Sequence, residues 1–342
     1  MLKSVISPIG SFQDKLIVGL MSIAIKFKSI DEITISKEMS TLSSLSNVGL
    51  SDAMIDRFFT PFYQGIFLSG LQSQSSRMFE FVFKMFTSGY ATLPNRGMGS
   101  IMLQLKSSIP SEAFKLNTLV TSITDGKVTT RSQSGEAVTY QAQHIVVATE
   151  APAAQRLLQS AAPCSITAPA ARKSTCVYFG IEGPPPILAP VLILNGENKL
   201  PQASFDVPGL VALEDVRINN VCFPSQVNPA YAPAGRSLAS VTVLGDVEHI
   251  GDAELVEAVR EQLAGWWGEA TRSWAFLRVY RVPYAQPAQT VPYESFQALQ
   301  SRVAPGVYVC GDHRASATLN GAMESGRRAA AAVLQDSRSS GV

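Results

Sequence analysis

The sequence predicts a mixed α/β protein of two domains, one of them assembled from separated segments of the chain. Apolar residues in the first ninety positions recur with helical spacing. Alternating and β-branched segments begin near Phe114 and return at Val307, and an alanine-rich stretch of helical spacing closes the chain. A chain that changes pattern in this way is expected to fold as layers of sheet and helix.

The composition is that of a globular protein with a sizeable core. Of 342 residues, 46% are hydrophobic, and the formal net charge is +1, so we do not expect nucleic acid as a partner. The four cysteines form no Cys-x-x-Cys pair, and the three histidines lack metal-ligand spacing, so neither a metal site nor a disulfide framework is expected. Each histidine (His144, His249 and His313) is expected to be hydrogen-bonded or exposed.

The segment from Val307 to Gln335 is expected to organise a binding site. Val307–Val309 predicts a buried strand, Gly311 and Asp312 follow it, and Thr318 is placed to cap a helix that begins at Leu319. Unpaired N–H groups at a helix N-terminus stabilise an anion or an electron-rich oxygen. Gly311 would let the backbone approach a ligand closely, and Asp312 would accept hydrogen bonds from hydroxyl groups.

This segment resembles the C-terminal flavin-binding motif of the flavin-containing amine oxidase superfamily, which includes monoamine oxidases, protoporphyrinogen oxidase and the phytoene desaturases. In that family the acid of the Gly-Asp pair lies near the ribityl–pyrophosphate part of FAD, and the helix N-terminus faces the O2 side of the isoalloxazine ring. The resemblance implies FAD-binding roles for six residues of the segment: Gly311, Asp312, Thr318, Leu319, Asn320 and Gly321. The residues alone leave two alternatives open, an αβ packing unit with a surface aspartate and a nucleotide-binding βα module unrelated to flavins.

The first ninety residues are expected to supply helices. Ser51 or Asp52 should cap a helix that ends before Pro61, and Met78–Phe86 should form a second, strongly apolar helix. The latter is core packing or, alternatively, a wall for a large apolar substrate. Leu16–Ile25 is too short to cross a bilayer and predicts a buried or interfacial helix, which leaves peripheral membrane contact open.

The middle of the chain is expected to alternate between the two domains. Gly97-Met98-Gly99 lacks the preceding strand and third glycine of a dinucleotide loop and resembles a turn of the same family instead. Strands are expected at Phe114–Ile123 and His144–Thr149, and a short helix at Glu294–Arg302. In the family, the strand that matches Leu116–Val120 offers backbone groups to the adenine of FAD, so the resemblance implies an FAD-binding role for Val120 as well.

The resemblance implies an FAD-binding domain of the amine oxidase or glutathione-reductase-like type, with an inserted substrate domain of mixed sheet and helices. Residues 1–92 and 161–289 are assigned to the substrate domain, residues 93–160 and 290–336 to the FAD-binding domain, and residues 337–342 to a flexible tail. The family opens with a βαβ unit that carries G-x-G-x-x-G, and nothing in residues 1–90 resembles it. We therefore expect an N-terminally truncated chain, and tight FAD binding is not expected without the phosphate-binding loop.

The function implied is that of an FAD-dependent oxidoreductase that dehydrogenates a large apolar small molecule, such as a polyene, a terpenoid or a porphyrin-like compound. No catalytic side chain can be identified, and many flavin oxidations need none, since the cofactor carries the chemistry. Sequence segments that resemble those of the desaturases, for example SDAMIDRFFTPFYQGIFL, also suggest a plastid location. The alternative is a non-catalytic relative that binds an apolar ligand or a partner protein.

Overall fold

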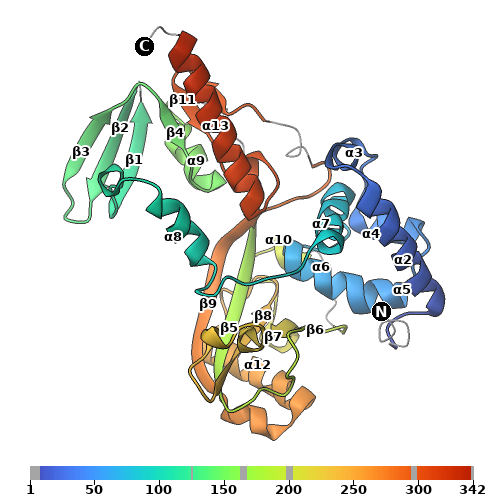
Figure 1. The fold of residues 1–342 in the computed structure, drawn as a ribbon. Helices are drawn as coiled ribbons and strands as arrows, with labels where there is room; N and C mark the ends of the chain where they lie inside the picture. Colours follow the sequence, from blue (N-terminus) through green and yellow to red (C-terminus); the bar gives the residue numbers. More distant parts are fainter. Residues whose placement is uncertain (1–7, 125, 162–167, 198–202, 294–298, 340–342) are drawn as a thin grey trace. The chain divides into compact units, whose positions relative to one another are not determined.

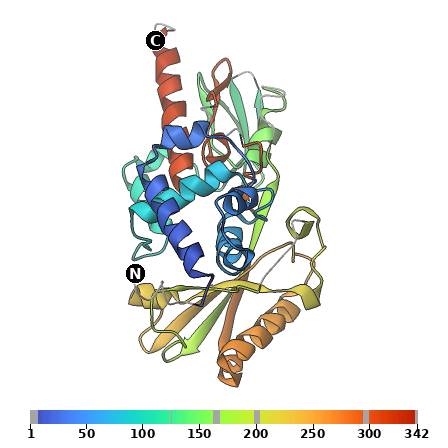
Figure 2. The ribbon, with the colours of Figure 1, turned by 90° about the vertical axis from the view of Figure 1, so that its right-hand side faces the viewer.

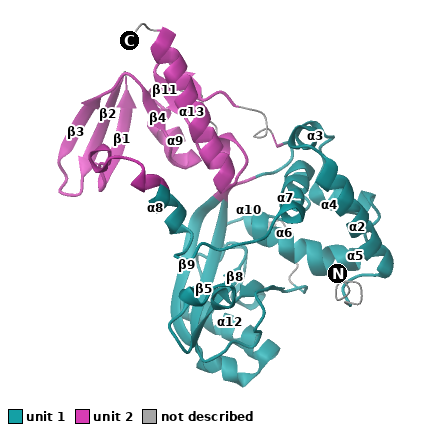
Figure 3. Cartoon of the chain, in the orientation of Figure 1, with its two compact units in different colours: residues 1–104, 172–285, 289–292 teal, residues 105–171, 286–288, 293–342 magenta. Residues whose placement is uncertain are grey.

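The computed structural model describes residues 8–124, 126–161, 168–197, 203–293 and 299–339 (Figure 1). The chain forms two compact units, both discontinuous in sequence (Figure 3). Unit 1 holds residues 1–104, 172–285 and 289–292, and unit 2 holds residues 105–171, 286–288 and 293–342. The assignment of residues 93–160 and 290–336 to a cofactor domain stays a prediction, because packing alone defines the units.

Unit 1 begins with a helical part in which serine side chains cap most of the helices. Ser11, Ser29, Ser40, Ser51 and Ser75 each accept a hydrogen bond from a backbone N–H of the first turn that follows. The elements are α2 (Phe12–Phe27), α3 (Ile30–Ile35), α4 (Thr41–Asn47), α5 (Asp52–Met54), the π-helix η1 (Ile55–Phe59), α6 (Thr60–Phe67), α7 (Ser76–Ser88) and α8 (Gly99–Ser107), the last of which runs into unit 2.

The helix expected to end before Pro61 does not end there. It passes from α5 through η1 into α6, and Pro61 lies in the first turn of α6. In a regular α-helix the proline ring would clash with the carbonyl four residues earlier. The N–H of Thr60 instead bonds to the carbonyl of Ile55, five residues back, and this wider turn gives the ring room. The prediction failed because a local π-helical turn can absorb a proline that would otherwise end a helix.

The rest of unit 1 is a five-stranded sheet with the order β6-β7-β8-β5-β9. Its strands are β5 (Ala171–Glu182), β6 (Leu192–Leu194), β7 (Ile218–Cys222), β8 (Arg236–Val243) and β9 (Ala275–Pro287). Helix α12 (Asp252–Trp267) lies along this sheet (Figure 2), and its Leu255, Val259 and Leu263 are buried in one cluster with Val177 and Val241. Short helical segments complete the unit: α10 (Ala203–Asp206), η3 (Leu213–Asp215), α11 (Pro224–Val227), η4 (Pro229–Tyr231) and η5 (Glu269–Ser273).

Unit 2 contains two three-stranded sheets, with the orders β1-β2-β3 and β10-β11-β4. The elements are η2 (Ser111–Ala113), β1 (Thr118–Thr124), β2 (Lys127–Ser132), β3 (Ala137–Gln141), β4 (Ile145–Val147), α9 (Ala151–Leu158), β10 (Arg302–Ala304), β11 (Val307–Val309), η6 (Asp312–Arg314) and α13 (Leu319–Ser339). Strand β11 lies in the middle of its sheet, parallel to β4 and antiparallel to β10. Ile123 of β1 is buried in one cluster with Val147 of β4 and Val309 of β11, so the two sheets share a core, as the sequence predicted.

Three sequence-based boundaries in unit 2 need correction. The strand expected from Phe114 begins only at Thr118, because Asn117 has a positive φ of 55°, which interrupts an extended strand. Helix α13 continues to Ser339, so residues 337–339 are helical and do not begin a tail. The helix expected at Glu294–Arg302 falls on residues 294–298, which lie outside the described residues, and Arg302 itself belongs to β10.

The N-terminal end of α2 is fixed to the start of α5 by a buried carboxylate. Asp14 accepts hydrogen bonds from the backbone N–H and hydroxyl of Ser11 at 2.6 and 2.7 Å, and from those of Ser51 at 2.7 and 2.8 Å. Burial alone would raise the pKa of Asp14, but these hydrogen bonds outweigh it and lower the pKa to about 2. The four bonds therefore hold an ionised group inside the protein and define how α2 is rotated about its axis.

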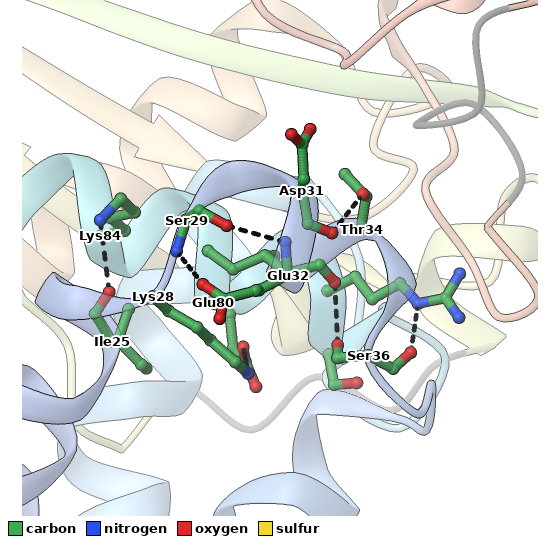
Figure 4. Close-up of polar contacts among 12 residues, drawn as sticks. Ile25, Lys28, Ser29, Asp31, Glu32, Thr34, Ser36, Glu80 and Lys84 are labelled. Carbon is green, nitrogen blue, oxygen red and sulfur yellow. Dashed lines mark hydrogen bonds and ion pairs between the residues drawn. The ribbon is translucent and has the colours of Figure 1, made fainter.

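The C-terminal end of α2 is held by polar contacts with α7 (Figure 4). Lys28 forms an ion pair with Glu80 of α7, and the Lys84 ammonium donates to the carbonyls of Ile25 and Lys26. Ser29 and Glu32 form a capping box, so α3 begins directly after the end of α2. Both ends of α2 are thus anchored to neighbouring helices of unit 1.

We predict that Asp14→Asn lowers the free energy of unfolding by about 1.5–3 kcal/mol, because it removes charge-assisted hydrogen bonds from a buried site. Asp31→Asn on exposed α3 is the control and should change stability little. The unfolded carboxyl titrates near 3.8 and the folded one near 2. The contribution of Asp14 should therefore be complete above about pH 4 and be lost as the pH falls toward 2. Urea unfolding at several pH values measures this, and equal stability losses for the two variants would contradict the role of Asp14.

Candidate functional site

The sequence-predicted site residues of the closing segment lie where β11 ends and α13 begins, all in unit 2. Strand β11 is buried at every residue, and the N–H of Cys310 extends its pairing by donating to the carbonyl of Val147 at 3.0 Å. The next N–H, that of Gly311, donates to the hydroxyl of Ser325 on α13 at 3.1 Å. The end of the strand is therefore tied both to β4 and to the second turn of the helix.

Gly311 occupies a backbone conformation that favours glycine. Its φ is 149°, and a Cβ atom at this position would lie 2.6 Å from Cε1 and 2.7 Å from Nδ1 of His313. Real Cβ atoms do not make contacts this short, so a side chain at Gly311 would displace the imidazole. The glycine thus allows the chain to turn tightly around the ring of His313.

Asp312 opens the short 3₁₀ turn η6 with its carboxylate partly exposed. Its side chain is 29% exposed to solvent, and its Oδ1 lies 3.8 Å from Nδ1 of His313. Among the described residues this is the one ion-pair contact that Asp312 makes. The carboxylate can therefore accept hydrogen bonds from the hydroxyl groups of a ligand, which is the role the sequence suggested.

His313 contradicts the expectation that each histidine is hydrogen-bonded or exposed. His249 is exposed, and His144 bonds to two hydroxyl groups, but the His313 side chain is only 1% exposed. Neither of its ring nitrogens has a hydrogen-bond partner among the described residues. An unpaired buried polar group costs on the order of 1–3 kcal/mol, so this ring is a candidate to bind a ligand atom.

The start of α13 is capped as the sequence predicted. The hydroxyl of Thr318 accepts a hydrogen bond from the N–H of Gly321 at 2.9 Å, and the carbonyl of Thr318 accepts from Ala322 at 3.0 Å. Within the described part of the chain, the N–H groups of Leu319 and Asn320 have no hydrogen-bond partner, and both residues are exposed. These two donors and the positive end of the helix dipole are free to meet an electron-rich group.

Gly321 is held by packing against the loop that precedes the helix. A Cβ atom there would lie 2.0 Å from the carbonyl oxygen of Ser316 and 2.5 Å from its hydroxyl. The space beside this glycine is filled by protein, which explains why no larger residue fits. A direct cofactor role for Gly321 stays a prediction.

Val120 lies on a different element from the other candidates. It is half-buried on β1 and packs against the core cluster that includes Val147 and Val309. Because β1 is an edge strand of its sheet, alternate residues present their N–H and C=O groups away from β2. Strand β1 can thus offer backbone groups to a ligand, but the role of Val120 itself stays a prediction.

Two arginines add positive charge near the Gly311–Asp312 turn. Arg314 donates to the carbonyl of Gln300 at 2.7 Å, and Arg328 of α13 donates to the carbonyl of Arg314 at 2.9 Å. Burial, and then the charge of Arg328, lowers the pKa of Arg314. The positive charge of these two side chains favours an anionic or electron-rich ligand nearby.

A polar network behind β11 was missed by sequence reasoning. The hydroxyl of Tyr308 donates to Asp336 at 2.6 Å and lies 3.3 Å from Nδ1 of His144, whose Nε2 lies 3.0 Å from the hydroxyl of Ser337. Arg302 also pairs with Asp336, at 3.3 Å. The network ties the last turns of α13 to β11. Its one signal in the sequence was a tyrosine in a strand predicted to be buried, because a buried tyrosine hydroxyl usually has a hydrogen-bond partner.

The residues present fit a cofactor that carries hydroxyl groups and a ring with an electron-rich edge. Asp312 supplies an acceptor, Leu319 and Asn320 supply donors, and the His313 ring has unpaired nitrogen atoms. No cluster of His, Cys, Asp or Glu side chains suited to a metal ion exists among the described residues. The groups that these residues supply can bind and orient a ligand.

The chain matches a known protein family over most of its length. The family described as flavin-containing amine oxidoreductases matches residues 10–334. None of the curated proteins compared with the chain matches it. Three solved structures resemble it at 14–16% identity, which establishes a shared fold alone.

The first of these structures is an Exiguobacterium sp. 255-15 protein assigned as a protoporphyrinogen oxidase, with 16% identity and a TM-score of 0.60 over 93% of this chain and 71% of its own. The second is an oxidoreductase from Methanosarcina mazei, with 16% identity and a TM-score of 0.65 over 95% and 73%. The third is cyclohexylamine oxidase from Brevibacterium oxydans IH-35A, with 14% identity and a TM-score of 0.57 over 95% and 75%. The mixed fold expected from the sequence is confirmed.

We predict opposite effects for two glycine substitutions on α13. Gly321→Ala should lower the free energy of unfolding by about 1–3 kcal/mol, because the new methyl group would overlap Ser316. Gly326→Ala is the matched control, since nothing lies within 4 Å of its Cβ position, and it should stabilise the helix by about 0.5–1 kcal/mol. Thermal unfolding of the two variants checks this, and a stabilised Gly321→Ala protein would show that Ser316 does not pack as described.

We also predict a stability change at high pH that depends on Tyr308. Burial and the hydrogen bond to Asp336 raise the pKa of Tyr308 from 10.0 to about 12. The folded protein therefore keeps a proton that the unfolded chain loses, so this contribution is complete below about pH 10 and is lost as the pH rises toward 12. Tyr308→Phe should be less stable at neutral pH by about 1–3 kcal/mol and should lose less stability between pH 10 and 12. Parallel pH curves for the two proteins would disprove the assigned network.

Proposed function

Because this chain belongs to the family of flavin-containing amine oxidoreductases, we propose that it uses FAD to dehydrogenate a large apolar substrate. The observation that carries the proposal is the turn at Gly311 and Asp312, which leads from buried β11 to the capped start of α13. Strand, turn and helix stand in the order that the flavin motif requires. The six candidate residues of the closing segment lie within this one continuous piece of unit 2.

Each feature of the turn has a defined task in this proposal. Asp312 accepts hydrogen bonds from the ribityl chain and keeps a partly exposed carboxylate for that purpose. The N–H groups of Leu319 and Asn320 donate to the electron-rich edge of the isoalloxazine ring. The ring of His313 donates to an oxygen of the ribityl–pyrophosphate region, which would satisfy one of its unpaired nitrogens.

When bound, FAD would supply the hydride-accepting chemistry for the substrate, with oxygen or another acceptor taking up the electrons afterwards. The protein's part is to hold the ring and to stabilise the negative charge that it gains. The N-terminus of α13 does this through its two free N–H groups and its dipole, and Thr318 keeps that end of the helix in place. No acid or base on the described residues is needed for this step.

The preference for a large apolar substrate is supported by an aromatic surface in unit 1. Phe58, Phe62 and Phe86 form a row of rings with centroid separations of 5.7 and 5.3 Å. Phe86 is 47% exposed, and the neighbouring Met85 is 42% exposed. Phe59 and Phe79, by contrast, are buried, so these helices pack in the core, and we propose that their exposed rings also form a wall for the substrate.

We predict that Asp312→Ala weakens FAD binding by roughly 10- to 150-fold, because a charged acceptor contributes on the order of 1.5–3 kcal/mol. Flavin fluorescence titration measures this, both on the chain and on the chain extended at its N-terminus by the βαβ unit of a related flavoenzyme. In the chain alone the loss should be smaller, because binding without a phosphate loop is weak from the start.

Glu324→Gln is the control for this titration. It also removes one negative charge, from the exposed face of α13, where Glu324 pairs with Arg327 at 2.7 Å. Equal FAD affinity in the extended protein with and without Asp312 would refute the role of this residue. A colourless extended protein that binds no FAD would favour the alternative of a non-catalytic relative.

A further inference from the structure

Helix α2 presents a continuous apolar stripe to the outside of unit 1. Its residues are separated by three or four positions and so lie on one face of the helix. All are more than half exposed: Phe12 (71%), Leu16 (55%), Leu20 (59%), Ile23 (59%) and Phe27 (81%). A helix on the surface of a globular protein usually turns such a stripe inward, so this arrangement calls for a binding partner.

The stripe cannot be turned inward by rotating the helix. The opposite face carries Asp14 and Ile25, which are buried, and Asp14 makes four hydrogen bonds to Ser11 and Ser51. At the other end, Lys84 donates to the carbonyl of Ile25 (Figure 4). A rotation would break these contacts and expose a carboxylate that is held ionised inside the protein. The outward stripe is therefore a fixed feature of the fold.

The charge on α2 favours one kind of partner. The charged residues of this helix are Asp14, Lys15 and Lys26. Asp14 is buried, so the outer face carries positive charge only, and helical geometry places Lys15 and Lys26 on the same flank of the stripe. Against a second copy of the chain, antiparallel pairing of two α2 helices would bring Lys15 near Lys26 of the other copy. Parallel pairing would place the two lysine-bearing flanks on opposite sides of the interface, so repulsion opposes the antiparallel arrangement in particular.

We propose that α2 is a docking surface for a membrane with negatively charged lipid headgroups. The stripe would enter the boundary between headgroups and acyl chains, while Lys15 and Lys26 meet lipid phosphates. No helix in the described part of the chain is long and apolar enough to cross a bilayer. The proposal concerns a lipid surface and stands apart from any flavin chemistry.

The experiment is co-sedimentation of the purified full chain with vesicles of phosphatidylcholine, with and without phosphatidylglycerol. The chain should bind the anionic vesicles and bind the neutral ones more weakly. The double variant Leu16→Ser, Phe27→Ser should lose at least roughly tenfold in partitioning to the anionic vesicles, because it removes two large apolar contacts. Lys15→Gln with Lys26→Gln should lose roughly tenfold on anionic vesicles and little on neutral ones.

The matched control is Leu188→Ser with Leu210→Ser, which removes two exposed leucines of unit 1 that lie outside α2. It should bind vesicles as the unchanged chain does, and circular dichroism should show that all variants keep their fold. Absence of binding to anionic vesicles, or equal losses in the α2 and control variants, would overturn the proposal. A different result would also overturn it: a chain that does not bind vesicles, that is dimeric by light scattering, and whose Leu16→Ser, Phe27→Ser variant is monomeric. The stripe would then be an interface between copies of the chain.

Discussion

The parallel pairing of β11 with β4 is the interaction on which the candidate site depends. It fixes Val307, Tyr308 and Val309 opposite Ile145, Val146 and Val147, and all of these residues except the exposed Val146 are buried in unit 2. The carboxyl ends of parallel strands are where open α/β sheets present ligand-binding residues. Gly311 and Asp312 lie at that end. The hydrogen bond from the N–H of Gly311 to the hydroxyl of Ser325 fixes α13 to the end of the strand. Asp312 and the start of the helix are thus positioned by buried backbone pairing.

Close packing on both sides of this turn restricts what residues it can contain. His313 fills the space beside Gly311, and Ser316 fills the space beside Gly321. The loop between them is therefore specified by contacts within itself, and the two glycines are required by its own side chains and carbonyls. The free donors of Leu319 and Asn320 and the carboxylate of Asp312 are the groups that this packing leaves available to a ligand.

The sequence predicted those features that short-range physics determines. The strand at Val307–Val309, the Thr318 cap and the helix from Leu319 follow from side-chain pattern and capping chemistry, and all three are present. Contacts between distant segments could not be read in this way. The network that joins Tyr308 to His144 and Asp336 and the burial of His313 without a partner both depend on tertiary packing. The π-helical turn before Pro61 was not predicted, for a different reason. The rule that a proline ends a helix assumes the hydrogen bonding of a regular α-helix.

The central claim is that the β11–α13 turn binds FAD, and amide hydrogen exchange with and without FAD tests it most directly. The N–H groups of Leu319 and Asn320 lack partners in the described structure, so they should exchange rapidly in the free protein. The account predicts that FAD at saturating concentration slows exchange over residues 311–322, with the largest change at these two amides. Bound FAD that leaves exchange across residues 311–322 unchanged would contradict the account.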